Sequence, residues 1–358
     1  MGSGQVGGAQ RMVALARRAR FAYVSRMRRM QSHMVKKLAG IVALGAGVSA
    51  AAVAGATAGV GYYVAHALTA PRRLDPMDEY VFTPYEAGVE WEHVSIPTDQ
   101  EARVLDGWWF PRPETERVIL GLTGYRSSKS DLIGIGSALW RAGYNVLLFD
   151  YPGHGHGPAA PVTLAHRELR DVRAALDYTL RRLPNAQIGV IGFSMGAALA
   201  ILAAAERTEI RAVIADSPFA THADVVSHAI TRTLRIIPGD PFLPAADFFL
   251  ERRAGYRSAD VAPLSVVEKI APRPLLLIHG TEDKTIPYSH TERLYAAAGD
   301  PKELWIAPGA GHCGAYFLDR PAYTQRMLTF FEMALDRDAA LDGVISAGQE
   351  GLEGNLAG

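Results

Sequence analysis

The chain has 358 residues, of which 49% are hydrophobic and 21% charged, and it contains a single cysteine. This composition excludes a collagen-like chain, an intrinsically disordered chain and a small domain held together by disulfide bonds. The formal net charge of zero hides an uneven distribution, because residues 1–74 contain eleven of the 37 Lys and Arg and no Asp or Glu. From Asp75 onward the chain has 26 basic and 37 acidic residues, which gives this part a formal net charge of −11. A basic N-terminal part therefore precedes an acidic body.

The first predicted element is a membrane anchor. Residues 38–70 form a run of 33 residues, rich in Ala and Gly, without Asp, Glu, Lys or Arg, and about 20 apolar residues span a bilayer as a helix. Nine basic residues precede this run and only Arg72 and Arg73 follow it closely. This bias places the N-terminus in the cytoplasm and the body on the outer side of the membrane. We predict a basic arm at 1–37, a single-pass transmembrane helix within 38–70 and a linker at 71–88.

Two alternatives for this N-terminal part stay open. A cleaved signal peptide would leave a secreted body, and Ala-x-Ala cleavage sites occur at residues 50–52 and 56–58. An organellar transit peptide is also compatible with the first 37 residues, which are rich in Arg and free of acidic residues. The lone cysteine does not discriminate between compartments, because it cannot form an intramolecular disulfide.

The body alternates short runs of Val, Ile and Leu with segments of helical length, which is typical of a mostly parallel sheet with helices on both faces. The first two of the eight strands alternate polar and apolar residues and should form an antiparallel edge hairpin, whereas the later strands have the apolar character of strands buried on both faces. The predicted strands are 91–96, 106–110, 117–122, 145–149, 187–191, 212–215, 275–278 and 303–306. The predicted helices are 131–142, 164–183, 195–206, 290–298 and 321–335.

One segment interrupts this alternation. Residues 218–271 lie between two predicted strands and are too long for a plain crossover. Their apolar side chains include Phe242, Leu243, Phe248 and Phe249. We predict that this insertion is a helical lid over the sheet. The predicted domain that contains it extends over 89–336, and residues 337–358 form a flexible tail.

The sharpest motif is Gly192-Phe193-Ser194-Met195-Gly196, which lies between a predicted strand and a predicted Ala-rich helix. In this context a G-x-S-x-G sequence forms a nucleophile elbow, in which the glycines permit a sharp turn and the serine hydroxyl stands clear of the sheet. The alternative is a glycine-rich loop in which the serine only caps the helix. We predict that Ser194 is a nucleophile.

A serine nucleophile needs a base, and the base needs a group that orients it. After such an elbow the acid and then the histidine follow along the chain. Asp283 and His312 each come just after the C-terminal end of a predicted parallel strand, where side chains from distant segments converge. We therefore predict that Asp283 orients the general base His312.

Several nearby residues compete for these roles. Glu282 is the less favoured of two adjacent carboxylates in its loop, and Asp216 is interpreted as the anchor of a turn with Ser217. His279, at a strand end, is interpreted as structural. Cys313 lacks an elbow and a separate base, so we interpret it as a small loop residue.

A metal site or a cofactor is not expected. His154 and His156 lie in a Gly-His-Gly-His-Gly turn, but a metal would require more ligands, and no Cys or acidic cluster accompanies them. The proposed serine chemistry needs no cofactor. Nucleic-acid binding is not expected either, because the body is net acidic and the basic residues cluster beside an apolar run.

From about Val89 to Leu335 the chain resembles serine hydrolases of the α/β-hydrolase superfamily. It is most similar to lidded, often membrane-attached members related to monoacylglycerol lipases, acyl-protein thioesterases and acyl-aminopeptidases. The matching segments are Phe-Asp-Tyr-Pro-Gly-His-Gly at 149–155, the elbow at Ser194, Ala-Asp-Ser-Pro at 215–218, His-Gly-Thr-Glu-Asp at 279–283 with Ile-Pro at 286–287, and Gly-His at 311–312.

The resemblance also implies an oxyanion hole formed by the backbone N–H groups of Tyr125 and Met195. The loop that commonly reads His-Gly-x reads Thr123-Gly124-Tyr125 here, but a main-chain donor does not depend on the side chain. Two cations, Arg126 and Lys129, lie near this loop in the sequence. We interpret them either as a binding site for an anionic head group or as exposed charges at the start of a helix.

Together these observations predict a serine hydrolase that cleaves a carboxylic ester or thioester, with a hydrophobic acyl group, through an acyl-enzyme intermediate. The expected partners are a small or lipid-like acyl substrate and a membrane; the sequence does not indicate an oligomeric state. A peptidase or amidase of the same fold is the first alternative, since the same triad serves both reactions. A non-catalytic binding protein of hydrolase fold, held at a membrane, is the second.

Overall fold

The structure is a computed structural model that describes residues 50–71, 82–98, 104–235 and 237–335. The predicted basic arm and C-terminal tail lie outside the described residues, as does most of the predicted linker. The described chain divides into two compact units. The smaller unit contains residues 50–64 and 226–246, and the larger one, called the sheet unit below, contains residues 65–225 and 247–335.

The N-terminal helix of the described chain is α2 (Ala50–Thr69). Within the smaller unit it lies very close to the start of α7 (Leu243–Ala254), because a Cβ added at Gly61 would lie 2.6 Å from the carbonyl carbon of Ala245. Over the described ranges, no helix combines the length and the hydropathy needed to cross a bilayer. The predicted transmembrane helix at 38–70 therefore has no support from α2, whose Ala and Gly side chains contribute little apolar surface. Residues 38–49 are outside the described part.

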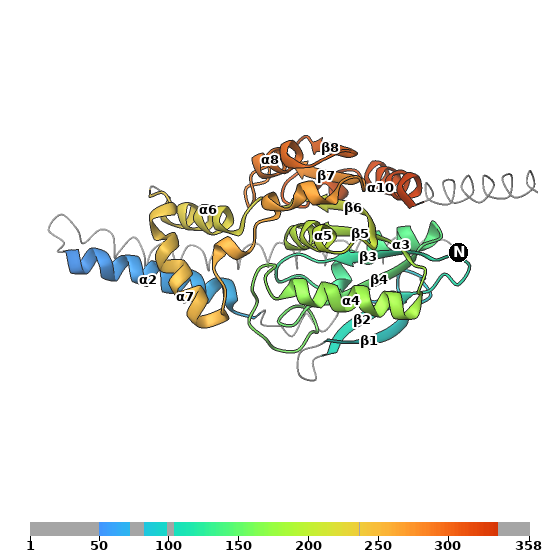
Figure 1. The fold of residues 1–358 in the computed structure, drawn as a ribbon, viewed down its shortest axis with the longest axis horizontal. Coiled ribbons are helices and arrows are strands. Elements are labelled where there is room, and N and C mark those ends of the chain that lie inside the picture. Colours follow the sequence, from blue (N-terminus) through green and yellow to red (C-terminus); the bar gives the residue numbers. More distant parts are fainter. Residues whose placement is uncertain (1–49, 72–81, 99–103, 236, 336–358) are drawn as a thin grey trace, which may run out of the picture. The chain divides into compact units, whose positions relative to one another are not determined.

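The sheet unit contains an eight-stranded sheet in the order β1-β2-β4-β3-β5-β6-β7-β8, as Figure 1 shows. Its strands are β1 (Glu92–Pro97), β2 (Val104–Phe110), β3 (Arg117–Leu122), β4 (Asn145–Asp150), β5 (Gln187–Phe193), β6 (Ile210–Asp216), β7 (Leu275–Gly280) and β8 (Lys302–Ala307). Strands β3 to β8 pair in parallel, whereas β2 is antiparallel to both β1 and β4. The predicted eight strands, the parallel core and the antiparallel edge hairpin are confirmed.

The remaining helices are α3 (Ile133–Arg141), α4 (Glu168–Arg182), α5 (Met195–Glu206), α6 (His222–Leu234), α8 (Ser289–Ala297), α9 (Ala315–Leu318) and α10 (Arg320–Leu335). The predicted bounds of α5 are confirmed, but α4 begins later than the predicted Leu164. Leu164 and Ala165 have positive φ angles of +48° and +82°, which a right-handed helix does not allow. The amides of Thr163 and Ala165 instead donate to the carboxylate of Glu168, the first residue of α4.

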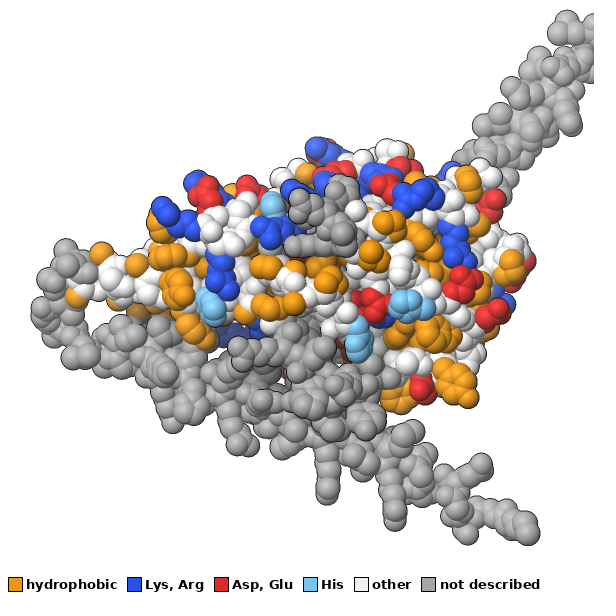
Figure 2. All heavy atoms as spheres, turned by 90° about the horizontal axis from the view of Figure 1, so that it is seen from below, with side chains coloured by type: hydrophobic (Ala, Val, Ile, Leu, Met, Phe, Trp, Pro, Cys, Tyr) orange, Lys and Arg blue, Asp and Glu red, His pale blue; other side chains and the backbone are white. Residues whose placement is uncertain are grey.

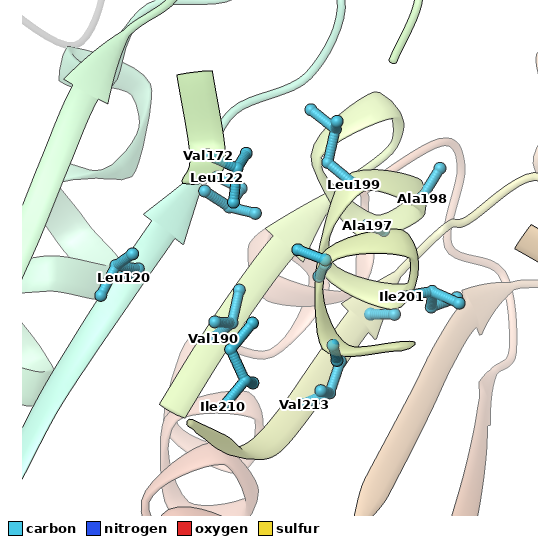
Figure 3. Close-up of a cluster of buried hydrophobic side chains, with 14 of the residues drawn as sticks. Leu120, Leu122, Val172, Val190, Ala197, Ala198, Leu199, Ile201, Ile210 and Val213 are labelled. Carbon is cyan, nitrogen blue, oxygen red and sulfur yellow. The ribbon is translucent and has the colours of Figure 1, made fainter. Parts of the chain in front are cut away.

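Hydrophobic cores lie on both faces of the sheet. On one face, side chains of α4, α5 and α8 pack against the strands, and on the other face those of α3 and α10 do so. Figure 3 shows part of the first core, in which Val190 and Val213 of the central strands belong to the same buried cluster as Leu199 of α5. Because α5 buries nearly all of its side chains, its N-terminus is held rigidly at the C-terminal edge of the sheet.

Between β6 and β7 the chain forms α6, α7 and four short 3₁₀ helices, so the predicted insertion at 218–271 is largely helical. Its middle part, 226–246, belongs to the smaller unit. That the insertion acts as a lid over the site stays a prediction.

On the face shown in Figure 2, Lys and Arg side chains are interspersed with Asp and Glu, so the charges of this face are mixed in sign.

Candidate active site

Ser194 occupies the turn between β5 and α5. Its φ of +55° and ψ of −114° are unusual for a residue other than glycine, and such a conformation persists only where the surrounding structure imposes it. The flanking glycines are required sterically: a Cβ on Gly192 would lie 2.1 Å from the oxygen of Gly196, and a Cβ on Gly196 would lie 2.2 Å from the oxygen of Leu122. The elbow predicted from the motif is confirmed as a backbone structure.

The structure brings the three predicted side chains together in one chain of hydrogen bonds. His312 Nε2 lies 2.9 Å from Ser194 Oγ, and His312 Nδ1 lies 2.6 Å from Asp283 Oδ2. His312 follows β8 and Asp283 follows β7, so the C-terminal ends of neighbouring parallel strands deliver both groups to the elbow. Since the carboxylate accepts the proton of Nδ1, Nε2 is left to accept the serine proton.

A network of donors holds the carboxylate of Asp283. Oδ1 accepts hydrogen bonds from the amides of Thr285 and Ile286, at 2.8 and 2.9 Å. On the other side, Oδ2 lies 3.1 Å from Nε2 of the fully buried His279. The same Nε2 faces the carbonyl oxygen of Ile286, so two acceptors require it to carry a proton, and Nδ1 then accepts from Thr291 Oγ1 at 2.6 Å.

The protonation states follow from these contacts. Burial by itself would raise the pKa of Asp283, but hydrogen bonds from His279 and His312 outweigh it and lower that pKa well below its usual range. Burial opposes the charged form of His312, yet the hydrogen bond and charge of the Asp283 carboxylate raise the pKa of His312 well above its usual value. Asp283 is therefore ionised at neutral pH and stabilises a positive imidazolium on His312.

Two backbone amides are available at the elbow. Met195 is the first residue of α5, where an N–H group has no acceptor within the helix. Gly124, next to Tyr125, lies against the elbow, because a Cβ added there would be 3.5 Å from Ser194 Cβ and 3.4 Å from the oxygen of Phe193. Among the described residues, neither the Tyr125 nor the Met195 amide has a backbone acceptor. The predicted oxyanion donors thus lie beside the serine, on a loop and at a helix N-terminus.

Comparison with known proteins agrees with this geometry. Residues 118–242 match the family model described as the alpha/beta hydrolase fold. The uncharacterised protein YqkD of Bacillus subtilis (strain 168) is 37% identical over 194 residues, which cover 53% of this chain and 63% of YqkD. The uncharacterised protein YfhR of Escherichia coli (strain K12) is 30% identical over 258 residues, 69% of this chain and 83% of YfhR. The chain belongs to the α/β-hydrolase superfamily.

A solved structure of this α/β-hydrolase architecture also resembles the chain. It is the esterase Pf2001 of Pyrococcus furiosus, with a TM-score of 0.62 and 26% sequence identity, over 75% of this chain and 98% of the esterase. The fold, the elbow and the strand ends that carry the acid and the histidine are those expected for an α/β-hydrolase.

The competing residues have other roles in this α/β-hydrolase. Glu282 is exposed, while Asp283 is buried in the site. Asp216 accepts from Tyr323 OH at 3.0 Å and from Ser217 Oγ at 2.9 Å, and burial raises the pKa of Asp216 to about 6. Asp216 therefore stabilises the turn after β6, as predicted. Burial raises the pKa of the Cys313 thiol, opposite to the shift that activates a cysteine nucleophile.

For Lys129, one of the two cations near the oxyanion loop, both predictions are wrong. Lys129 is buried and pairs with Asp150 at 2.8 Å and Asp106 at 2.9 Å, so it is neither an exposed charge nor available to an anionic head group. Arg126 donates to the carbonyl oxygens of Ala67 and Ala70 at 2.7 and 3.0 Å. The partners of both cations come from distant segments, which the local pattern does not indicate.

The two histidines of the Gly-His-Gly-His-Gly turn are held by ring contacts and hydrogen bonds with nearby residues. His154 is buried between the rings of Tyr125 and Tyr151, and its Nδ1 lies 3.1 Å from the oxygen of Pro152. The amide of His156 donates to Asp150. In the described part of the chain, no group of three or more His, Cys, Asp or Glu side chains is arranged to hold a metal.

Sequence reasoning missed the contact of His279 with the acid of the site. The spacing of four residues between His279 and Asp283, just after a strand end, is the signal that could have indicated it. Sequence reasoning also missed the link between the oxyanion loop and α2, because the residues involved lie more than fifty positions apart.

Proposed function

We propose that this α/β-hydrolase is a serine hydrolase that cleaves a carboxylic ester or thioester through an acyl-enzyme intermediate. The observation that carries the proposal is the continuous hydrogen-bond chain from Ser194 Oγ through His312 to Asp283, at 2.9 and 2.6 Å. A serine hydroxyl is a weak nucleophile until a positioned base accepts its proton.

The proposed reaction has two halves. Ser194 Oγ attacks the substrate carbonyl carbon while His312 Nε2 takes the hydroxyl proton, and the N–H groups of Tyr125 and Met195 stabilise the oxyanion. His312 then gives the proton to the leaving alcohol or thiol as the tetrahedral intermediate collapses. In the second half, His312 accepts a proton from water, water attacks the acyl-enzyme, and Ser194 recovers its proton.

Two observations support the substrate class. The similar structure of Pyrococcus furiosus Pf2001 is that of an esterase. On α7, Phe248 is half exposed and packs edge to face against Phe249, with ring centroids 5.1 Å apart. Apolar aromatic surface of this kind favours a hydrophobic acyl group, which we propose as the acyl part of the substrate.

The test is turnover of p-nitrophenyl esters by the full chain and by Ser194→Ala. We expect hydrolysis by the wild type and a loss of about a thousandfold or more in kcat for Ser194→Ala, because removal of the nucleophile leaves only binding and oxyanion stabilisation. A fluorophosphonate probe should label the wild type and not the variant. Undiminished turnover by Ser194→Ala would refute the mechanism. Faster hydrolysis of a matched acyl p-nitroanilide than of the ester would favour an amidase instead.

A further inference from the structure

The last turn of α2 is bound by two adjacent side chains of the oxyanion loop. A helix C-terminus leaves its last carbonyl groups without donors from within the helix. Tyr125 OH donates to the oxygen of Leu68 at 2.8 Å and lies 3.2 Å from that of Ala67. Arg126 Nη2 donates to the oxygens of Ala67 and Ala70. The positive guanidinium also lies at the end of the helix where the backbone dipoles leave partial negative charge.

The same turn is fixed to the sheet unit on another side. Thr69 is fully buried; its Oγ1 donates to the oxygen of Ala65 at 2.7 Å and accepts from Arg253 Nε at 2.6 Å. The oxygen of Thr69 accepts from the amide of Val162. Ala65 is part of a small buried cluster with Leu250, Ala254 and Tyr256. The turn is therefore a fixed attachment point within the sheet unit.

The loop bound to this point carries the proposed oxyanion donor. Gly124 lies against Ser194, and the next residue supplies the N–H group. Arg126, after it, has a φ of +57°, a conformation that an arginine adopts at a cost and that tertiary contacts must maintain. Burial raises the pKa of Tyr125 to about 12, so its hydroxyl remains a neutral donor at physiological pH.

We infer that the Tyr125 hydroxyl and the Arg126 guanidinium are positioning groups, which bind the C-terminal carbonyls of α2 and thereby hold the Tyr125 N–H in the oxyanion hole. The last turn of α2 is then a structural part of the catalytic apparatus, and its displacement lowers turnover. This inference rests on the proposed serine hydrolase function.

The test uses the full chain with Tyr125→Phe and Arg126→Gln. Loss of a whole oxyanion donor lowers kcat by about 10²–10³; a displaced donor retains part of its effect, so we expect kcat to fall about 10-fold with KM within about twofold of the wild type. A trifluoromethyl ketone forms a tetrahedral adduct with its oxygen in the hole, and its affinity should fall by the same factor. Tyr178→Phe and Arg173→Gln, which remove the same groups from exposed hydrogen bonds, should behave as the wild type.

A second variant acts on the other side of the attachment point. Thr69→Val removes both hydrogen bonds of the Thr69 hydroxyl without touching the oxyanion loop, and it should lower kcat as well. Combined with Tyr125→Phe, it should lower kcat by less than the product of the two single effects. Arg126→Lys, which keeps a cation, should restore part of the activity lost in Arg126→Gln. The thermal unfolding midpoint of each variant verifies that it is folded.

The outcomes separate this inference from the proposed function. If the wild type is labelled by a fluorophosphonate and the Tyr125 and Arg126 variants keep their kcat and ketone affinity, the inference alone is overturned. A loss that appears in KM, or that leaves ketone affinity unchanged, overturns it too. If the wild type neither hydrolyses esters nor is labelled, the proposed function fails and this inference fails with it.

Discussion

At the scale of single residues, the site depends on how each group is surrounded. Asp283 is ionised because donors converge on both of its oxygens, while Asp216, also buried near the elbow, has its pKa raised to about 6 because burial dominates there. Asp216 ends β6 and Asp283 follows the neighbouring strand β7, but only Asp283 contacts His312. The acid of the triad is thus identified by its contacts, since residue type alone does not separate the two.

The pH dependence of activity follows from His312. Only the neutral imidazole can accept the serine proton, and the hydrogen bond and charge of the Asp283 carboxylate oppose the effect of burial and raise the pKa of His312 well above 6.5. We expect kcat/KM to increase with pH through that raised pKa, so that activity is still rising at pH 6.5. The measurement is the pH profile of kcat/KM with an activated ester. A profile that is already level below pH 6.5 would contradict this prediction.

At the scale of elements, the oxyanion loop is held on one side by α2 and on the other by a buried ion pair. Lys129 begins the 3₁₀ turn that leads from the loop into α3, and its Nζ contacts both Asp150, at the end of β4, and Asp106, in β2. The backbone N–H of Lys129 also donates to Asp150. This pair therefore connects the loop to two strands of the sheet.

Lys129→Met tests the contribution of this ion pair to stability. The substitution keeps the length of the buried side chain and removes the cation, which leaves the Asp150 carboxylate buried without its charged partner. We expect the free energy of unfolding to fall by about 3–5 kcal/mol, measured by urea denaturation. Removing the exposed pair of Arg173 and Glu206 by Arg173→Gln should cost less than about 1 kcal/mol. Equal losses in the two variants would argue against this role for Lys129.

At the scale of the whole molecule, stability couples to pH through buried groups. His222, at the start of α6, is fully buried, and burial lowers its pKa to about 3. The unfolded chain binds a proton at this histidine below pH 6.5, whereas the folded chain does not do so until about pH 3. The contribution of His222 is therefore complete above pH 6.5 and is lost as pH falls towards 3.

His222→Gln isolates that contribution. As pH decreases from 6.5 towards 3, the wild type should lose stability relative to the variant by up to about 1.4 kcal/mol per pH unit. Urea denaturation of the wild type and of His222→Gln over this pH range gives the difference between their free energies of unfolding. The contributions of the other titrating groups cancel in this difference. A difference between the two chains that does not change with pH would show that His222 is not responsible.

Much of the site was predictable because its signals are local. The glycines around Ser194 are required by contacts within the turn and with the adjacent strand, so the motif itself specifies the elbow. Asp283 and His312 were predictable because each follows an apolar strand. The start of α4 was not, because the apolar pattern does not show that Leu164 and Ala165 have positive φ angles and that the amide of Ala165 donates to the Glu168 carboxylate. The membrane orientation stays a prediction, since residues 1–49 lie outside the described part.

By itself, the sequence determined the alternation of strands and helices, the nucleophile elbow and the order of the acid and the base, since these depend on periodicity and on glycine at particular positions. Only the tertiary structure decided which partners the polar groups have: Lys129 with Asp150, His279 with Asp283, and Arg126 with the end of α2. The physical reason is that a buried polar group must find a hydrogen-bond partner wherever the fold places one, and that partner often lies far away along the chain.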